Sequence, residues 1–111
     1  MKISHLDQLE NQAVSHNPAI AKKVMLACGD IAPITQFAQA TFPPGSKAPT
    51  HAHNDMIEVF LIEQGSGRII VEGTIHAVSA GSSIAIEPGE SHELENTGKD
   101  NLVVSYFSIR T

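Results

Sequence analysis

The sequence predicts an all-β domain, built either as a sandwich or as a closed barrel. Its 111 residues suffice for one hydrophobic core and are too few for two. After Pro18, no segment keeps the helical spacing of apolar residues over several turns. Glycine, proline, asparagine and aspartate instead interrupt the chain about every ten residues, and they supply the dihedral angles of tight turns. Many short strands joined by such turns are typical of a sandwich or barrel.

The N-terminal segment is interpreted as a short arm, residues 1–20, that precedes a β-barrel domain of residues 21–111. The arm is mostly polar, and apolar residues spaced by three from Ile3 to Leu9 could form one or two helical turns against the domain. Pro18 is expected to end any such helix, because proline fits poorly inside one.

Eight strands are expected along the barrel domain. Residues 57–62 are apolar on both faces except for one acid, as in a strand that is covered on both sides. Residues 35–41 alternate only loosely between apolar and polar side chains. The eight predicted strands are residues 23–28, 34–42, 57–63, 68–72, 74–78, 83–87, 92–95 and 102–109.

The most unusual stretch is a histidine pair, His51 and His53, followed by Glu58 within the apolar run. Side chains two residues apart on a strand point to the same face, so the two imidazoles can converge on one point. The Asn54-Asp55 turn lets Glu58 face them from a neighbouring strand. A buried carboxylate costs on the order of several kcal/mol unless a cation or hydrogen-bond donors meet it. A metal ion is the simplest such cation.

A further candidate ligand, His92, follows the predicted strand 83–87 and the turn Pro88-Gly89. If that strand lies across the barrel, His92 can meet the other three side chains. Three neutral imidazoles and one carboxylate suit a divalent transition ion such as Mn, Fe, Co, Ni, Cu or Zn. On an octahedral ion, these ligands would leave two positions for water, oxygen or substrate.

The first group of residues resembles the first motif of the cupin superfamily. That motif is a glycine, five residues, His-x-His, three or four residues, a glutamate, six residues and a glycine. Each of those places is filled in this chain, by Gly45, His51, His53, Glu58 and Gly65.

The second motif of the superfamily is matched less completely. It runs glycine, five residues, Pro-x-Gly, two residues, histidine, three residues and asparagine. The residues that fit it are Gly81, Gly89, His92 and Asn96. Glu87 stands where proline is expected, and Pro88 follows one place late. The turn can still form, so His92 remains a candidate ligand, and Asn96 is interpreted as a turn residue.

The resemblance implies a small single-domain protein of the conserved-barrel (cupin-2) type. Its fold would be a jelly-roll β-barrel, also called a double-stranded β-helix, and such barrels are often dimeric. The resemblance also implies that His51, His53, Glu58 and His92 bind one divalent metal ion. The alternative, in which these four side chains bind no metal, stays open because single histidines usually have no ligand.

Two classes of function remain open for such a site. An enzyme would use the metal to activate oxygen, polarise a carbonyl or stabilise an enediolate. Cupins with this ligand set include dioxygenases, isomerases, decarboxylases and lyases, and oxidative cleavage of a small chelating substrate is the leading prediction. The alternative is a non-catalytic module that binds or senses a small ligand, and a purely structural barrel is a third option.

The other notable polar side chains lie outside the motifs. We expect His5 and His16 to be exposed, whereas His76 could point inward from its strand. Tyr106 could donate a proton near a metal-bound substrate, although a tyrosine half-buried at a barrel mouth is commoner. The role of Arg68 stays open.

The cysteine and the basic residues argue against a disulfide-stabilised fold and against nucleic-acid binding. Cys28 is the only cysteine, which excludes an intrachain disulfide, and it is expected to be buried as a small hydrophobic residue. Lys22 and Lys23 are the only adjacent basic residues, and we expect them at a solvated strand or helix end. A net charge of −5 without a basic cluster argues against nucleic-acid binding.

The distribution of apolar residues predicts the cellular location, the oligomeric state and the lining of the barrel. No stretch approaches the length of a membrane span, and the N-terminus lacks the apolar run of a signal peptide, so a cytoplasmic location is expected. The two-sided apolar strand and the hydrophobic residues of the arm predict a homodimer that buries a sheet face. The side chains expected to line the barrel interior are Phe42, Met56, Phe60 and Phe107.

Overall fold

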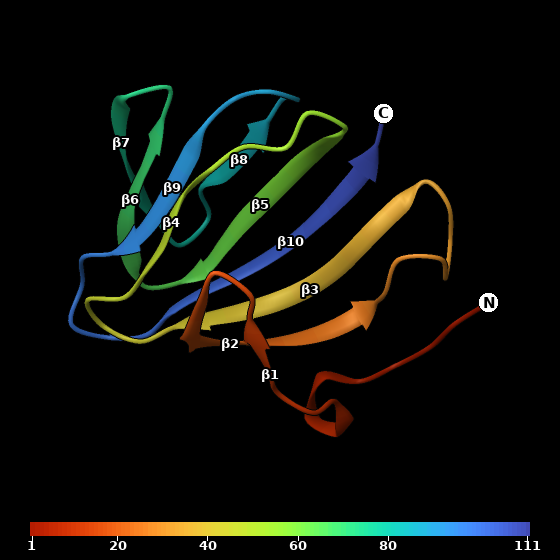
Figure 1. The fold of residues 1–111 in the computed structure, drawn as a ribbon. Helices are drawn as coiled ribbons and strands as arrows, with labels where there is room; N and C mark the ends of the chain where they lie inside the picture. The colour runs from red at the N-terminus through yellow and green to blue at the C-terminus, as the bar shows by residue number, and fades with distance from the viewer.

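The computed structural model describes residues 1–111 as two antiparallel sheets that face each other (Figure 1). The larger sheet has the strand order β1-β2-β3-β10-β5-β8, and the smaller has the order β4-β9-β6-β7. The only helical element is one short 3₁₀ turn, so the predicted all-β jelly-roll barrel is confirmed. The elements are η1 (Leu6–Gln8), β1 (Gln12–Val14), β2 (Asn17–Leu26), β3 (Ile34–Phe42), β4 (Lys47–His51), β5 (Met56–Gln64), β6 (Ser66–Val71), β7 (Thr74–Ser79), β8 (Ser83–Ile86), β9 (His92–Asn96) and β10 (Leu102–Arg110).

All eight predicted strands are present, and β3 has the predicted bounds. Neither β1 nor β4 follows from the sequence pattern. The first is only three residues long, and β4 contains Pro49, which is unusual in a strand. Proline is tolerated there because β4 lies at the edge of its sheet, where one row of backbone groups needs no partner.

The N-terminal residues are more closely joined to the barrel than the sequence suggests. Pro18 does not end a helix; it lies in β2, which pairs with β1 and β3. The Asn17 side-chain amide donates a hydrogen bond of 3.0 Å to the backbone oxygen of Lys47, and this bond joins β2 to β4 of the other sheet. β2 runs across residue 20 without a break. The division into an arm (1–20) and a barrel (21–111) stays a prediction.

The hydrophobic core fills the space between the two sheets. Its buried side chains come from both layers: Ile20, Ala40, Phe42, Ile62, Ile69, Val78, Ile86, Leu94, Leu102 and Val104. Phe60 packs against this core, and Met56 lines the same interior, so both face inward as predicted. Burial of these apolar side chains is the main term that holds the sheets together.

Phe107 is the exception among the side chains expected inside the barrel. Its neighbours Tyr106 and Ser108 line the interior, so alternation along β10 places Phe107 on the outer face. There it lies in register with Phe37 of β3 and Val59 of β5. The outer face of the larger sheet therefore carries an apolar row across three strands.

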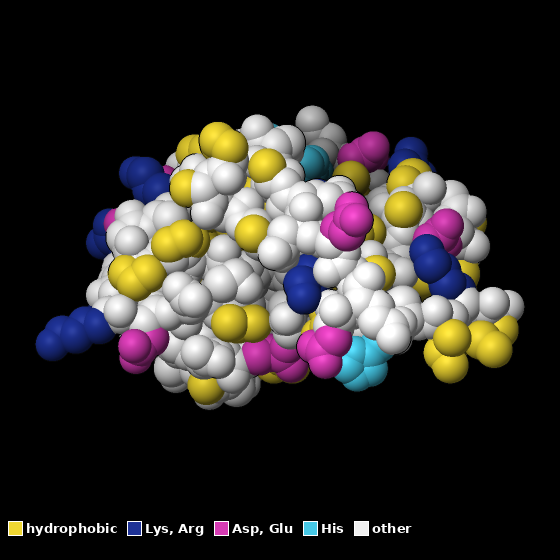
Figure 2. Space-filling model, turned by 90° about the horizontal axis from the view of Figure 1, so that it is seen from below, with side chains coloured by type: hydrophobic (Ala, Val, Ile, Leu, Met, Phe, Trp, Pro, Cys, Tyr) yellow, Lys and Arg dark blue, Asp and Glu magenta, His cyan; other side chains and the backbone are white.

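The surface carries charges of both signs. Figure 2 shows hydrophobic, acidic and basic side chains interspersed on the face seen from below, and the basic side chains do not gather into one patch on this face. None of the chain's helical structure is long or apolar enough to cross a membrane.

Asn96, at the end of β9, is buried and holds the turn to β10. Its side-chain amide donates to the backbone oxygens of Phe42 (2.8 Å) and Asp100 (2.9 Å). Its side-chain oxygen accepts from the backbone N–H of Gly98 at 3.0 Å. The interpretation of Asn96 as a turn residue is consistent with these three bonds.

We expect Asn96→Ala to lower the free energy of unfolding by about 2 to 3 kcal/mol, because two carbonyls lose their donor and a buried space opens. Urea denaturation followed by circular dichroism measures the change. Thr97→Ala is the matched control, since Thr97 is exposed in the same turn, and it should shift stability by less than about 0.5 kcal/mol. Equal effects of the two substitutions would contradict the assigned role.

Candidate metal centre

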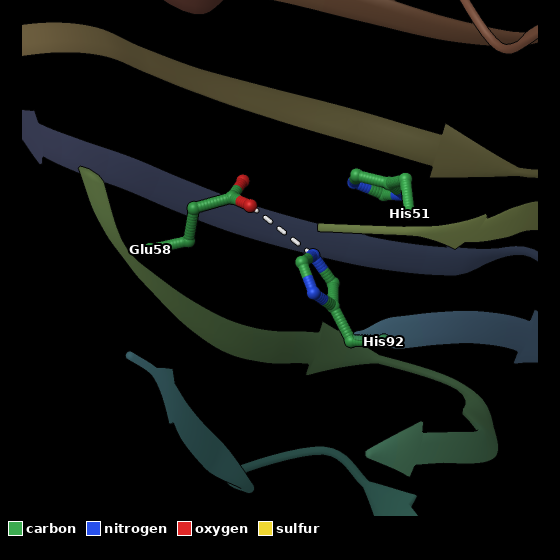
Figure 3. Close-up of side chains that lie close together, drawn as sticks. All are labelled: His51, Glu58 and His92. Atoms are coloured by element: carbon green, nitrogen blue, oxygen red, sulfur yellow. Dashed lines mark ion pairs between the residues drawn. The ribbon is translucent and has the colours of Figure 1, made fainter. Parts of the chain in front are cut away.

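The centre of the barrel brings together side chains from both sheets. His51 ends β4 and His92 begins β9, and the two residues are register partners in the smaller sheet. Their ring centroids lie 4.3 Å apart. Glu58 faces them from β5 of the larger sheet, and Figure 3 shows the three side chains pointing toward one another.

This arrangement differs in two respects from the one expected from spacing. β4 ends at His51, so His51 and His53 do not lie two apart on one strand. β4 pairs with β9 and not with β5, so Glu58 meets the histidines from the opposite sheet rather than from a neighbouring strand. The residues nevertheless converge, because the two sheets pack face to face.

Three of the four candidate ligands form a compact group. Potential ligand atoms of His51, Glu58 and His92 all lie within 4.8 Å of one another. Glu58 Oε1 and His92 Nε2 are 3.1 Å apart. Both atoms are buried, yet neither forms a well-directed hydrogen bond with any protein group. Because buried polar atoms without partners are costly, the pair suits a cation bound by both. These three residues could hold a metal ion.

Two backbone carbonyls orient the imidazoles. His51 Nδ1 lies 2.8 Å from the oxygen of Pro49, and His92 Nδ1 lies 3.0 Å from the oxygen of Glu90. A carbonyl oxygen can only accept, so each Nδ1 carries the proton and donates. In the neutral ring the Nε2 lone pair is then free for a metal, a common arrangement for histidine ligands.

His53 lies at the edge of this group, in the loop after β4. Its Nε2 is 3.5 Å from Glu58 Oε1, and its ring centroid is 5.2 Å from that of His51. The centroid of His92 is farther, at 6.4 Å. About a third of the His53 side chain is exposed (35%). The structure therefore places His53 next to the carboxylate but outside the compact group of three.

The electrostatics of the site favour an ionised acid. Burial opposes a charge on Glu58, but the rings of His92, His53 and His51 outweigh it and hold the pKa of Glu58 below its usual range. Burial also acts against His92, yet Glu58 and the carbonyl of Glu90 raise the pKa of His92. For His51, burial dominates and lowers the pKa, which favours the neutral ring that can bind a metal.

A cavity of about 380 Å³ extends from this site through the barrel interior. Half of the residues that line it are hydrophobic and half are polar or charged, so the cavity offers both apolar surface and hydrogen-bonding groups to a small molecule. Tyr106 lines the cavity and stacks on Phe60, with ring centroids 5.8 Å apart. Burial, together with the negative charge of Glu58, raises the pKa of Tyr106 to about 12. The phenol therefore stays neutral at ordinary pH and can donate a hydrogen bond.

Sequence reasoning missed several residues of this cavity, among them His16 and Lys22. His16 is exposed, as predicted, but its ring stacks on that of His51 with centroids 4.8 Å apart. No local pattern reveals this contact, because it depends on the β1–β2 turn lying beside β4. Lys22 is not at a solvated strand end; it is half-buried and lines the cavity. Alternation with Ile20, which is fully buried two residues earlier, is a signal that could have found it.

Cys28, His76 and Arg68 lie outside the compact group of three. Cys28 is exposed rather than buried, because β2 ends at Leu26 and the chain turns before reaching it. His76 is exposed on β7, yet it shares strand parity with the buried Val78 and lines a second hollow beside it, as the inward alternative expected. Arg68 pairs with Glu95 across β6 and β9 at 2.8 Å, and it does not line the cavity.

Known proteins resemble the chain in both sequence and fold. A family model for the cupin domain matches residues 38–109. An oxalate-binding protein from Thermotoga maritima is 36% identical over 66 residues, which cover 60% of this chain and 54% of that protein. The chain spans about half the length of the curated relatives it matches.

Solved structures share the architecture at low sequence identity. A protein from Thermotoga maritima described as a predicted oxalate decarboxylase has a TM-score of 0.92 and 24% identity, with 98% of this chain and 99% of that chain covered. The polyketide cyclase RemF from Streptomyces resistomycificus has a TM-score of 0.82 and 18% identity, with 99% and 79% covered. At these identities the likeness concerns the fold.

Titration of Tyr106 tests the electrostatics of the cavity. The chain has one tyrosine and no tryptophan, so phenolate absorbance reports this group alone. We expect a midpoint near pH 12 in the folded protein and near 10 in the unfolded chain. Because the unfolded chain releases the proton first, the free energy of unfolding should fall as the pH rises from 10 toward 12.

Circular dichroism at each pH establishes that the titrated chain is folded. Glu58→Gln removes the nearby negative charge and should lower the Tyr106 midpoint. A folded wild type that titrates at the unfolded value would refute the described environment of the phenol.

Proposed function

This chain belongs to the cupin domain family, and from that premise we propose that it is a metal-dependent protein acting on a small chelating molecule. The observation that carries the proposal is the buried pair of Glu58 Oε1 and His92 Nε2, which face each other without a well-directed hydrogen bond. A divalent ion would satisfy both atoms at once. The free Nε2 of His51 lies within reach of the same point.

The proposed ligand set is His51, His53, Glu58 and His92. A modest rotation of the half-buried His53 side chain would bring its Nε2, already 3.5 Å from the carboxylate, to the same ion. Three imidazoles and one carboxylate suit Mn, Fe, Co, Ni, Cu or Zn. Such an ion acts as a Lewis acid toward a bound oxygen donor.

Elemental analysis of purified protein tests the metal site. We expect close to one divalent transition ion per chain in the wild type and almost none in His92→Ala or Glu58→Gln. His76→Ala is the matched control, because His76 is exposed on β7, at the opposite edge of the smaller sheet from β4. This variant should retain the metal. Metal at a hundredfold excess over its dissociation constant should stabilise the wild type by about 2.7 kcal/mol. A metal-free wild type that also refuses all six added ions would refute the proposal.

The ligand is proposed to be a small carboxylate that chelates the ion through oxygen. Support comes from the oxalate-binding relative in Thermotoga maritima and from the cavity volume of about 380 Å³, which suits a small molecule. Oxalate is therefore the first probe. Calorimetric titration of metal-loaded protein should show binding that metal removal abolishes.

Catalysis is the second candidate, and the neutral Tyr106 in the same cavity favours it. A protonated phenol beside a metal-bound substrate can serve as a proton donor. An oxygenase-type reaction remains the leading enzymatic possibility. Oxygen uptake and product analysis with chelating diols, diketones and carboxylates test it. Turnover that is lost in Tyr106→Phe would establish an enzyme, whereas thermal stabilisation without turnover would favour a binding or sensing module.

A homodimer is proposed from the apolar row Phe37, Phe107 and Val59 on the outer face of the larger sheet. Burying this row against a second copy would remove it from water. Light scattering at micromolar concentration should give twice the chain mass, and Phe107→Ser should give a monomer. A monomeric wild type would contradict this. The cytoplasmic location stays a prediction.

A further inference from the structure

The charges inside the cavity differ from those of the chain as a whole. The chain carries a net charge of −5. Among the residues that line the cavity, Lys22 and Arg110 are basic and Glu58 is the only acid. Two basic residues against one acid already give the lining a net charge of +1 (2 − 1), and a divalent ion bound as proposed would make it more positive. Such a space attracts anions.

Lys22 is the better placed of the two cations. It lies on β2 facing the interior, is half-buried, and forms no ion pair. Its ammonium group donates a hydrogen bond of 2.9 Å to the side-chain oxygen of Gln36. A partly desolvated ammonium with a neutral partner gains from an incoming anion. Arg110 is exposed, and its guanidinium lies 3.7 Å from Cys28 Sγ.

Strand register relates Gln36, the hydrogen-bond partner of Lys22, to Glu58 of the candidate metal site. Gln36 of β3 is in register with Ser108 of β10, and Ser108 is in register with Glu58 of β5. All three residues line the cavity. Neighbouring strands are about 4.8 Å apart, so two spacings, about 10 Å, separate the backbones at Gln36 and Glu58. Both side chains line the cavity, so the ammonium group held by Gln36 and the carboxylate of Glu58 face the same interior space from strands two apart.

We propose that Lys22, positioned by Gln36, selects ligands that carry a second carboxylate beyond the one that chelates the metal. The ligand class is a small 2-hydroxy or 2-oxo dicarboxylate. Its hydroxy- or oxo-acid end binds the ion, and its distal carboxylate accepts hydrogen bonds from the Lys22 ammonium group. This inference rests on the proposed metal-dependent function and adds a specificity-determining residue to it.

A matched pair of ligands tests the proposal. Malate and 2-hydroxybutanoate have the same chelating end and the same number of carbons, and only malate carries the distal carboxylate. Calorimetric titration of metal-loaded wild type should show malate binding tighter by about tenfold to a hundredfold, as expected for a charge-assisted hydrogen bond. This comparison needs no variant, so it stands even if a substitution impairs folding.

Variants of β2 then assign the preference to one side chain. Lys22→Gln should remove the preference for malate while leaving 2-hydroxybutanoate binding and metal content within about twofold of wild type. Lys22→Arg should retain most of the preference, because it keeps the charge. Lys23→Gln is the matched control, since Lys23 is adjacent but donates instead to the backbone oxygen of Leu6 at 2.9 Å.

The outcomes separate this inference from the function on which it rests. Equal affinity of the wild type for the two ligands overturns the role of Lys22 and leaves the metal-anchored function intact. A preference that survives Lys22→Gln but is lost in Arg110→Gln also overturns it. If neither ligand, nor oxalate, binds to metal-loaded wild type, the proposed function itself fails and the inference with it.

Discussion

The buried carboxylate of Glu58 is the constraint on which the rest of the structure depends. Only 9% of this residue is exposed, and an unpaired charge at such a position would cost on the order of several kcal/mol. Its register neighbours, Ser108 and Ile86, offer no cation, so compensation has to come from the facing sheet. His92, whose pKa Glu58 raises, lies 3.1 Å away on that sheet, and His51 lies beside it because β4 and β9 pair in that register. The candidate site therefore depends both on the register of β4 and β9 and on the packing of the two sheets.

The barrel fold determines where the candidate site lies, and the side chains that line the cavity determine what that site can bind. A polyketide cyclase shares this architecture at 18% identity, which illustrates how weakly the fold constrains the reaction. In this chain the distinctive groups of the lining are Lys22, Tyr106 and His16, none of which belongs to the two cupin motifs. Differences at such positions would decide which small molecule the cavity could hold beside the candidate metal site.

Local chemistry predicted most of the fold. The strands could be located because glycine and proline turns bound runs of β-branched and apolar residues, and β3 has its predicted bounds. Both missed strands lack that signal. β4 carries Pro49, and β1 is stabilised by its pairing with β2 rather than by its own residues. Cys28 was misplaced for a related reason, since its apolar context did not show that β2 ends before it.

The sequence by itself determined the all-β class and the residue types of the candidate site, because turn chemistry and motif spacing are properties of short segments. Tertiary structure alone decided how those residues meet. It placed Glu58 on the sheet opposite the histidines, His53 at the edge of the group, and His16 against His51. These contacts join residues far apart along the chain. They arise only when two sheets pack and bury their inner faces, which no local pattern encodes.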